Sequence, residues 1–510
     1  MNVAPAARDQ FLLFSLPVGG LTSAIIITEY AIKILALGMV PENRQPASSH
    51  AWLLAILFIP VVGVPMFLLF GNPYVTGRRH VIQARANQLY ADALADRPNV
   101  PVGVRVAPGV QTILDMNRAL TAIPCMSGEF VALHSDYSAS LAAMTEAVRS
   151  AVDRVHIEFY AQSWDDETDE FFTAVVEAAE RGVTVRVLAD HLGSARYKGY
   201  KVLRRRLRGT PVQFHLMLPI NPFVGRFRRP DLRNHRKLLI VDGEHGFVGS
   251  QNLIDRHYGS ARGARLGREW VDLMMEVRGE IAHAMDGVFA VDWYTESDEI
   301  IETLEELEQG FPVTAMSASG DPTAGDPVSA FQLVPSGPGY RTQPGLRMFT
   351  QLISQARERL RIVSPYFVPD EALLHALTSA AYRGVAVELF VPENADQFMV
   401  HHAQRSYFRA MLEAGVTIHR FRSPAVLHTK LMLVDDYGGI VGSSNMDLRS
   451  FNLNFEVSML VLGGEAVAEL NGVVEQYLEE SSTLDLDTWM NRPWPGRYVD
   501  NVARLTSALQ

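Results

Sequence analysis

Apolar and polar positions beyond residue 100 alternate between short apolar runs and longer amphipathic stretches, as strands and helices do in α/β proteins. Two passages, residues 151–190 and 356–394, repeat this order. Each predicts a strand, around Ile157 and around Ile362, followed by a helix, an Arg-Gly-Val break and a second strand. The pattern therefore predicts an α/β fold made of two similar halves.

An almost purely apolar pattern occupies the N-terminal part of the chain. No Asp, Glu, Lys or Arg occurs between Arg44 and Arg78. Before this run the sequence is also apolar, apart from Glu29 and Lys33, which lie one helical turn apart and can pair with each other. Apolar runs of this length are typical of membrane-spanning helices.

Residues 1–75 are therefore predicted to form a transmembrane helical hairpin, with spans at about 11–40 and 50–71. The basic sequence Gly-Arg-Arg-His at 77–80 follows the second span, and positive charge favours the cytoplasmic side. We expect a multi-pass protein of the cell membrane whose large domain is cytoplasmic. A cleaved signal peptide is the alternative, but the apolar region is too long for one and a second span follows it.

Length and composition limit the remaining possibilities. With 510 residues the chain is long enough for two or three domains. A single cysteine, Cys125, excludes an intramolecular disulfide framework and a cysteine-based zinc site. Residues 314–330 are small, polar and rich in Pro and Gly, which predicts a linker. We place the first half at 76–313 and the second half at 331–510.

A motif with identical spacing occurs once in each half. It has the form H-x-K-x4-D-x6-G-S-x-N, and chance agreement at all of these positions in both halves is very improbable. Its chemically active members are His235, Lys237, Asp242, Ser250 and Asn252 in the first half, and His428, Lys430, Asp435, Ser443 and Asn445 in the second.

The histidine and lysine of each motif point to the same face of an extended strand, because side chains alternate between faces. They can therefore meet one ligand, whereas Asp242 and Asp435 have the opposite parity and are expected to support the strand from behind. A fixed cation beside the histidine would repel a metal ion, so we predict a phosphate site and no metal or other cofactor. Further hydrogen-bond donors to the phosphate are expected from Ser250, Asn252, Ser443 and Asn445.

Two motifs bring two histidines, so one imidazole can attack a phosphoryl group while the other protonates the leaving alcohol. An attacking imidazole must be neutral and correctly oriented, which requires a carboxylate on its other nitrogen. Matching the two halves downstream of the motifs places Asp272 opposite Glu456, so these are the candidate orienting residues. Glu269 is a competing choice. A lone histidine is usually an ordinary surface or core residue, but the duplicated motif favours the catalytic interpretation.

The distribution of charge indicates an anionic partner. The formal net charge of -11 argues against generic nucleic-acid binding. Residues 201–237, however, contain eleven Lys or Arg and a single acid, Asp231. Their position immediately before His235 favours contact with an anionic substrate or an anionic lipid surface, although a solvated basic surface is the plainer alternative.

The doubled motif resembles the HKD signature of the phospholipase D superfamily. Within that superfamily the chain is similar to the bacterial cardiolipin synthases with two N-terminal transmembrane segments. The resemblance covers nearly the whole chain and is carried by the apolar hairpin, "IEFY", "SGPG" at 336–339, "SPYFVPDEALLHAL", "AAYRGV" and "GSSNMDLRSFNLNFE".

This resemblance implies two phospholipase D-like halves packed face to face, with the active site between them. It also implies that one phosphatidylglycerol donates its phosphatidyl group to an enzyme histidine and that a second takes it, giving cardiolipin and glycerol. In relatives the first motif usually supplies the nucleophile, which makes His235 the nucleophile and His428 the general acid and then base. The expected partners are phosphatidylglycerol and anionic membrane lipid, without nucleic acid, and the oligomeric state stays open.

Other functions remain open at this point. A membrane-bound phospholipase D would use the same residues but pass the phosphatidyl group to water, giving phosphatidic acid. A nuclease of the superfamily would also use the doubled motif, but the acidic net charge and the apolar hairpin oppose it. A non-catalytic membrane scaffold would not need two undamaged copies of the motif.

Overall fold

The computed structural model describes residues 20–42, 44, 46–71, 78–95, 97–101, 104, 106–220, 229–304 and 329–505. It divides into two compact units, Met1–Asn72 and Pro73–Gln510. Apart from Ser329 and Ala330, the predicted linker lies outside the described residues.

Apolar helices make up the described part of the N-terminal unit: α1 (Gly20–Met39), α2 (Pro46–Phe58) and α3 (Pro60–Phe70). On α1, Lys33 Nζ lies 2.5 Å from Glu29 Oε1, so the predicted pair is confirmed. The predicted span at 50–71 is not one helix. Proline has no N–H to continue the helix, and Pro60 therefore begins α3 after a break at Ile59 (φ -135°).

No helix within the described ranges is both long and apolar enough to cross a membrane, so the predicted pair of spanning helices is not confirmed. Residues 11–19 of the first predicted span lie outside the described part of the chain. Many large apolar side chains of this unit are exposed, among them Ile27, Leu35, Val61 and Leu68. Such a concentration of exposed apolar groups is typical of a surface that contacts lipid or another protein.

The first half is built on a seven-stranded sheet with the order β2-β10-β8-β7-β3-β4-β5. The strands β3, β4 and β5 are parallel, and β7, β8, β10 and β2 continue the sheet in antiparallel order. The strands are β2 (Glu129–His134), β3 (Arg154–Phe159), β4 (Thr184–Asp190), β5 (Gln213–Met217), β7 (Lys237–Val241), β8 (His245–Gly249) and β10 (Met274–Arg278). The helices are α4 (Arg78–Ala93), α6 (Tyr137–Ser150), α7 (Asp169–Glu180), α8 (His191–Ala195), α9 (Lys198–Leu207), α10 (Ala261–Arg265) and α11 (Glu280–Ser297).

The second half is built on a larger sheet with the order β1-β11-β20-β18-β17-β12-β14-β15-β21. Its strands are β1 (Met126–Ser127), β11 (Ala330–Ser336), β12 (Arg359–Val363), β14 (Ala386–Pro392), β15 (Thr417–Phe421), β17 (Leu431–Val434), β18 (Gly438–Gly442), β20 (Asn454–Leu462) and β21 (Ser481–Thr483). Its helices are α5 (Pro108–Thr121), α13 (Pro344–Gln355), α14 (Glu371–Tyr382), α15 (Phe398–Glu413), α16 (Leu448–Asn452), α17 (Gly464–Glu479), α18 (Leu486–Met490) and α19 (Trp494–Arg504). A short parallel pair, β13 (Phe367–Val368) with β19 (Met446–Asp447), lies apart from the main sheet.

Corresponding elements in the two sheets confirm the predicted duplication. The unit β3-α7-β4 corresponds to β12-α14-β14, with parallel strands in both cases. Both helices end at the Arg-Gly-Val break, where Gly182 (φ 97°) and Gly384 (φ 89°) adopt the left-handed conformation that terminates helices.

The boundary predicted between the halves does not hold for every element. Both α5 and β1 precede β2 in the chain and were assigned to the first half. In the structure β1 pairs antiparallel with β11, and α5 packs against α13. The reason is burial, because Val110, Ile113 and Leu114 of α5 belong to the apolar core of the second half.

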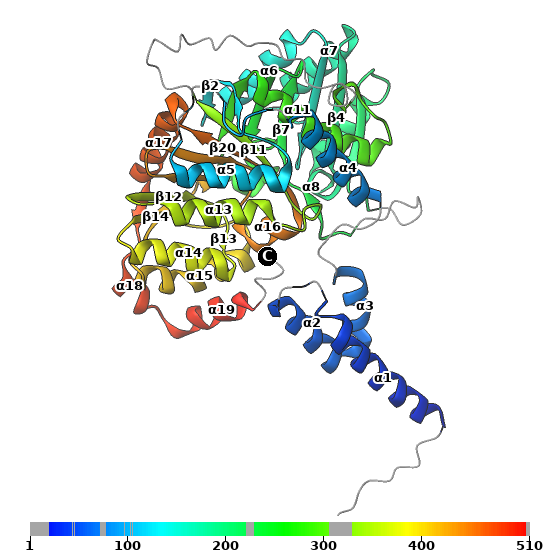
Figure 1. The fold of residues 1–510 in the computed structure, drawn as a ribbon, viewed down its shortest axis with the longest axis vertical. Helices are drawn as coiled ribbons and strands as arrows, with labels where there is room; N and C mark the ends of the chain where they lie inside the picture. The colour runs from blue at the N-terminus through cyan, green and yellow to red at the C-terminus, as the bar shows by residue number, and fades with distance from the viewer. Residues whose placement is uncertain are drawn as a thin grey trace, which may run out of the picture. The chain divides into compact units, whose positions relative to one another are not determined.

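The two sheets share one apolar core. Leu238 and Ile240 of β7 lie in the same cluster as Leu431 and Leu433 of β17. On the opposite face of the second sheet, α5, α13, α14 and α15 form a layer (Figure 1). Two short parallel pairs also join the halves, β6 (Arg233–Asn234) with β20 and β9 (Trp270–Val271) with β16 (Val426–Leu427).

Candidate active site

Each motif histidine follows directly after a short strand that pairs with the other half. The His235 N–H donates to the carbonyl oxygen of Phe455 at 2.8 Å, extending the β6–β20 pair by one residue. The His428 N–H donates to the carbonyl oxygen of Val271, also at 2.8 Å, beyond the β16–β9 pair. The backbone therefore fixes each histidine against the opposite half of the molecule.

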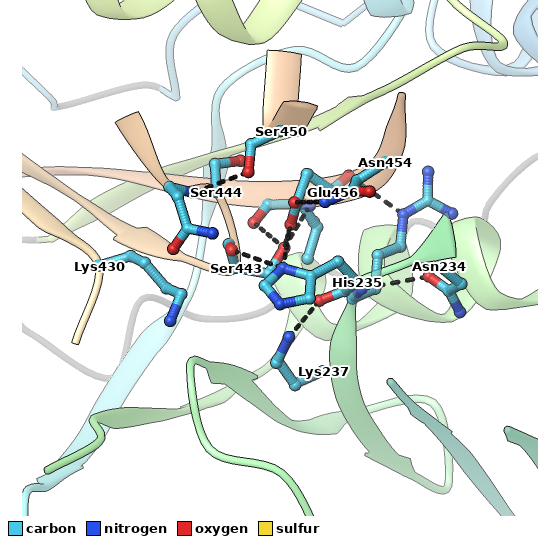
Figure 2. Close-up of polar contacts among 12 residues, drawn as sticks. Asn234, His235, Lys237, Lys430, Ser443, Ser444, Ser450, Asn454 and Glu456 are labelled. Atoms are coloured by element: carbon cyan, nitrogen blue, oxygen red, sulfur yellow. Dashed lines mark hydrogen bonds and ion pairs between the residues drawn. The ribbon is translucent and has the colours of Figure 1, made fainter. Parts of the chain in front are cut away.

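Each motif histidine is hydrogen-bonded to a carboxylate of the other half. His235 Nδ1 lies 3.0 Å from Glu456 Oε2 and 3.1 Å from the carbonyl oxygen of Ser443, both in the second half (Figure 2). His428 Nδ1 lies 2.6 Å from Asp272 Oδ1, in the first half. An ionised carboxylate and a carbonyl oxygen only accept hydrogen bonds, so Nδ1 carries the proton. The lone pair is therefore on Nε2 in the neutral form of both rings.

The structure thus pairs each histidine with one of the two predicted orienting residues, and not with the competing choice. The carbonyl oxygen of Glu269 accepts from the N–H of Val426, where β9 and β16 meet. Neither histidine is hydrogen-bonded to the Glu269 side chain, since their Nδ1 atoms are bonded to Glu456 and Asp272.

Ser250 and Ser443 were predicted to bind phosphate, but their hydroxyls support the carboxylates instead. Ser443 Oγ donates to Glu456 Oε2 at 2.5 Å and accepts from the N–H of Val457 at 3.0 Å. Ser250 Oγ donates to Asp272 Oδ1 at 2.6 Å and accepts from the N–H of Leu273 at 3.0 Å. Each hydroxyl proton is therefore used on an orienting carboxylate, so the motif serines hold these carboxylates in place.

The two motif asparagines differ in their surroundings. Asn252 is engaged by the protein: its Oδ1 accepts from the N–H of Ala161 at 3.1 Å and its Nδ2 donates to the Tyr258 hydroxyl at 2.9 Å. The side-chain oxygen of Asn445 is buried and has no hydrogen-bond partner among the described residues. The open atom of Asn445 is an acceptor, so it can meet a donor group of a bound ligand but not a phosphate oxygen.

Both motif lysines are buried beside the histidines. Lys237 Nζ donates to the carbonyl oxygen of His235, and Lys430 Nζ donates to that of His428, each at 2.5 Å. Burial lowers the pKa of Lys237 well below its usual value, and the charge of Lys430 adds to this effect although Glu456 opposes it. Burial likewise lowers the pKa of Lys430 to about 8. A bound anion would stabilise the charged form of both ammonium groups, so the two lysines favour an anionic ligand.

The histidines and carboxylates have complementary charge states. Burial lowers the pKa of His235 to about 4, against the attraction of Glu456 and with the help of Lys237 and Lys430. Burial also lowers the pKa of His428. Burial alone would raise the pKa of Asp272, but the charge of His428 and the surrounding hydrogen bonds hold it at about 2. The His235–Glu456 pair therefore consists of a neutral imidazole and an ionised carboxylate.

The electrostatic couplings cross the two motifs. The charge of Lys430 acts on the pKa of His235, and the charge of Lys237 acts on the pKa of His428. Figure 2 shows Lys237 and Lys430 reaching toward His235 from different directions. Both motifs therefore belong to one site between the halves.

The motif aspartates lie away from this site. Asp242 Oδ1 accepts from the N–H groups of Asp153 and Arg154 at 2.8 and 2.9 Å, and Asp242 Oδ2 accepts from that of Val152 at 3.0 Å. Asp435 makes the same contacts with residues 357–359. Both aspartates have a positive φ, 54° and 48°, in the turn after the motif strand. They bind the start of the neighbouring strand and do not contact either histidine.

Sequence reasoning missed several side chains around the histidines. Tyr160 lies edge-on to His235, with ring centroids 5.1 Å apart. Arg233 and Arg236 belong to the basic stretch that was expected to face lipid, but both are buried. Arg233 Nη1 lies 3.1 Å from Asp190 Oδ1, and the Arg236 guanidinium pairs with a buried aspartate. Their place next to the histidine in the sequence was the available signal.

The exposed part of the basic stretch is different. Arg204, Arg205 and Arg206 lie in the last turn of α9 and are exposed. Residues 221–228 of the stretch lie outside the described residues. In the part of the chain that the structure describes, no group of three or more His, Cys, Asp or Glu side chains is placed to hold a metal ion.

Comparisons with known proteins agree with this geometry. The family profile described as "Cardiolipin synthase, PLD-like domain" matches residues 144–293 and 349–478, and the one described as "Phospholipase_D-nuclease N-terminal" matches residues 30–72. A cardiolipin synthase of Alkalihalophilus pseudofirmus is 31% identical over 485 residues, which cover 94% of this chain and 93% of that protein. Cardiolipin synthase A of Proteus mirabilis is 31% identical over 473 residues, which cover 92% of this chain and 94% of that protein.

A solved structure shares the fold. The crystal structure of phosphatidylserine synthase from Haemophilus influenzae aligns with a TM-score of 0.58 at 15% sequence identity. The alignment covers 79% of this chain and 100% of that one. At this level of identity the likeness concerns the fold alone, and it supports the two packed α/β halves.

Proposed function

The chain belongs to the cardiolipin synthase family of the phospholipase D superfamily, and from this premise we propose that it joins two phosphatidylglycerols into cardiolipin and releases glycerol. The observation that carries the proposal is the pair of exchanged contacts, His235 with Glu456 and His428 with Asp272, beside two buried lysines. This arrangement supplies a nucleophile, an acid and two cations around one phosphodiester.

In the first step His235 attacks the donor lipid. Its Nε2 lone pair forms a bond to phosphorus, and the bond from phosphorus to the glycerol oxygen breaks. His428, in its protonated form, gives a proton to that oxygen, so glycerol leaves as a neutral alcohol. Lys237 and Lys430 balance the charge on the non-bridging oxygens. The product is a phosphatidyl group on His235, with the positive ring charge stabilised by Glu456.

In the second step the roles of His428 reverse. The now neutral imidazole takes a proton from the free hydroxyl of a second phosphatidylglycerol, and that oxygen attacks phosphorus. The bond between phosphorus and His235 breaks, which restores the neutral nucleophile and releases cardiolipin. The choice of His235 as nucleophile follows the order of the motifs, and labelling the covalent intermediate with acid-free quenching tests it.

We further propose that residues 1–75 attach the enzyme to the cell membrane as an integral segment, with the catalytic unit on the cytoplasmic side. Exposed apolar side chains on α1, α2 and α3 support lipid contact. The basic residues after the second apolar run support the orientation. A lipid substrate confined to the same membrane makes such attachment useful for the reaction.

The decisive experiment uses full-length protein reconstituted with labelled phosphatidylglycerol, followed by separation of the lipids. Cardiolipin and glycerol are the expected products, and His235→Ala and His428→Ala should abolish both. Phosphatidic acid as the main product would replace the synthase with a phospholipase D. Equal product from the parent and both alanine variants would instead favour a non-catalytic scaffold.

A further inference from the structure

Aromatic side chains form a line along the first half that starts at His235. Tyr160 lies edge-on to this histidine, with ring centroids 5.1 Å apart. Arg196, at the end of α8, places its guanidinium carbon 5.7 Å from the Tyr160 ring centroid and 4.8 Å from that of Tyr197. Arg196 therefore contacts two tyrosines, and one of them, Tyr160, also contacts His235.

The same line continues to the other histidine. The ring centroids of Tyr197 and Tyr258 are 6.4 Å apart, and Tyr258 lies edge-on to His428 with centroids 5.9 Å apart. Tyr258 is itself fixed, because it stacks on Trp270 at 4.4 Å. Arg196 therefore lies between Tyr160 and Tyr197, within a series of ring contacts that connects His235 with His428.

The charge of Arg196 is not neutralised by an acid, unlike that of the neighbouring buried arginines. Arg233 pairs with Asp190, and Arg236 also pairs with a buried aspartate. Among the described residues, Arg196 has no carboxylate within ion-pair distance, and its side chain is exposed. Apart from its interaction with the Tyr197 hydroxyl, the Arg196 guanidinium keeps N–H donors for an anion, and phosphate matches their planar geometry.

The nearby acid on the opposite half is already engaged. Asp396 contributes to the electrostatic environment of Tyr197, but its Oδ1 accepts from the Tyr366 hydroxyl at 2.7 Å. Tyr366 in turn packs against the cluster of Val368, Val400 and neighbouring side chains. This contact engages one carboxylate oxygen of Asp396 on its own half, and among the described residues no ion pair joins Asp396 to Arg196.

We propose that Arg196 binds the phosphate of the acceptor lipid, the second phosphatidylglycerol. This inference rests on the proposed function and assigns a second phosphate position in the same site. The acceptor attacks through a hydroxyl at one end of its glycerol while its own phosphodiester sits at the other end. A second anion therefore lies one glycerol length from the phosphorus held by the lysines, and Arg196 is a cation without an acidic partner beside that position.

The assignment separates the two half-reactions. Donor cleavage needs the two histidines and the two lysines, whereas Arg196 is needed only when the acceptor itself carries a phosphate. Free glycerol is an acceptor without a phosphate, and its transfer onto the phosphatidyl enzyme regenerates phosphatidylglycerol. Arg196 is therefore a specificity-determining residue that favours an anionic lipid acceptor over a neutral alcohol.

The test compares Arg196→Gln and Arg196→Lys with Arg347→Gln, a matched control at an exposed arginine of α13 outside the basic stretch. Reconstituted full-length protein is assayed for cardiolipin formation and, separately, for incorporation of labelled glycerol into phosphatidylglycerol. Arg196→Gln should lower cardiolipin formation about 10- to 100-fold, the usual effect of losing hydrogen bonds to a charged group. Glycerol incorporation should stay near the parent rate, which also shows that the variant is folded.

Three results would overturn the inference. Cardiolipin formation and glycerol incorporation that fall together would place Arg196 in donor binding or in the general structure. Unchanged cardiolipin formation in Arg196→Gln would remove the residue from the site. Arg196→Lys retains the charge and should lie between the parent and the glutamine variant, so a lysine variant no better than glutamine would also refute the proposal.

The outcomes also separate this inference from the proposed function. If the parent protein neither forms cardiolipin nor incorporates glycerol, the proposed function itself is wrong. If the parent does both and His235→Ala does neither, the function stands, and the ratio of the two activities in the Arg196 variants decides the acceptor site alone.

Discussion

Replacing Glu456 by glutamine is expected to disable His235, although Glu456 lies in the half that carries His428. Glu456 is fully buried and accepts hydrogen bonds from His235 Nδ1 at 3.0 Å, Ser443 Oγ at 2.5 Å and Asn454 Nδ2 at 3.2 Å. Glutamine has nearly the same shape but no charge. The substitution therefore tests the charge of the carboxylate more than its packing.

The size of the effect follows from the charge that develops on His235. As Nε2 bonds to phosphorus, the ring becomes cationic while its Nδ1–H still faces residue 456. Leaving a buried charge without its partner costs about 3–5 kcal/mol. Formation of the phosphatidyl enzyme should therefore slow by about 10²- to 10⁴-fold in Glu456→Gln.

The assay follows the phosphatidyl enzyme by rapid quenching with two donors, phosphatidylglycerol and an analogue whose leaving group is p-nitrophenol. A leaving group that needs no proton bypasses the general acid. The analogue should therefore rescue His428→Ala and Asp272→Asn, since Asp272 orients His428. It should not rescue His235→Ala or Glu456→Gln.

The reasoning fails if Glu456→Gln behaves like His428→Ala and Asp272→Asn behaves like His235→Ala. That pattern would pair each carboxylate with the histidine of its own half. The comparison holds whichever histidine is the nucleophile, because each carboxylate variant is matched to a histidine variant.

Three further predictions concern stability, pH and metal ions. Asp242→Ala removes the acceptor for the N–H groups of residues 152–154. It should lower the free energy of unfolding by roughly 3 kcal/mol, measured by urea titration. A variant as stable as the parent would contradict this structural role. The folded pKa of His235 is depressed from 6.5 to about 4, so the unfolded chain binds the extra proton and stability should fall as the pH drops from 6.5 towards 4. His235→Gln should remove about 3 kcal/mol of that pH dependence, and an unchanged pH profile of unfolding would refute the shift. Chelation by EDTA should leave cardiolipin formation unchanged because Lys237 and Lys430 provide the positive charge, and a loss restored by a divalent cation would show otherwise.

Local sequence patterns predicted the main elements of the catalytic unit. The strand-helix-strand repeat and its Arg-Gly-Val breaks appear in the structure with glycines in the left-handed conformation at Gly182 and Gly384. These features depend on neighbouring residues, which a sequence displays directly. The allocation of α5 to the second half depends instead on which apolar core buries Val110 and Ile113, and that is a long-range choice.

The apolar N-terminal pattern was only partly informative. Hydrophobicity alone favoured a continuous helix over 50–71, but Pro60 ends one helix and starts the next. Pro60 has no N–H to donate, so the helix is interrupted there although the whole run is apolar. The pairing of Glu29 with Lys33 followed from helical spacing and is present.

By itself the sequence displayed the duplicated motif, and strand periodicity predicted that each histidine shares a face with its lysine and that Asp242 and Asp435 lie apart from them. Only the tertiary structure decided that Glu456 serves His235 and Asp272 serves His428. Each of those contacts joins residues in different halves, and spacing along one chain does not specify how two sheets meet. The same holds for Arg196, whose place between the histidines arises from aromatic packing.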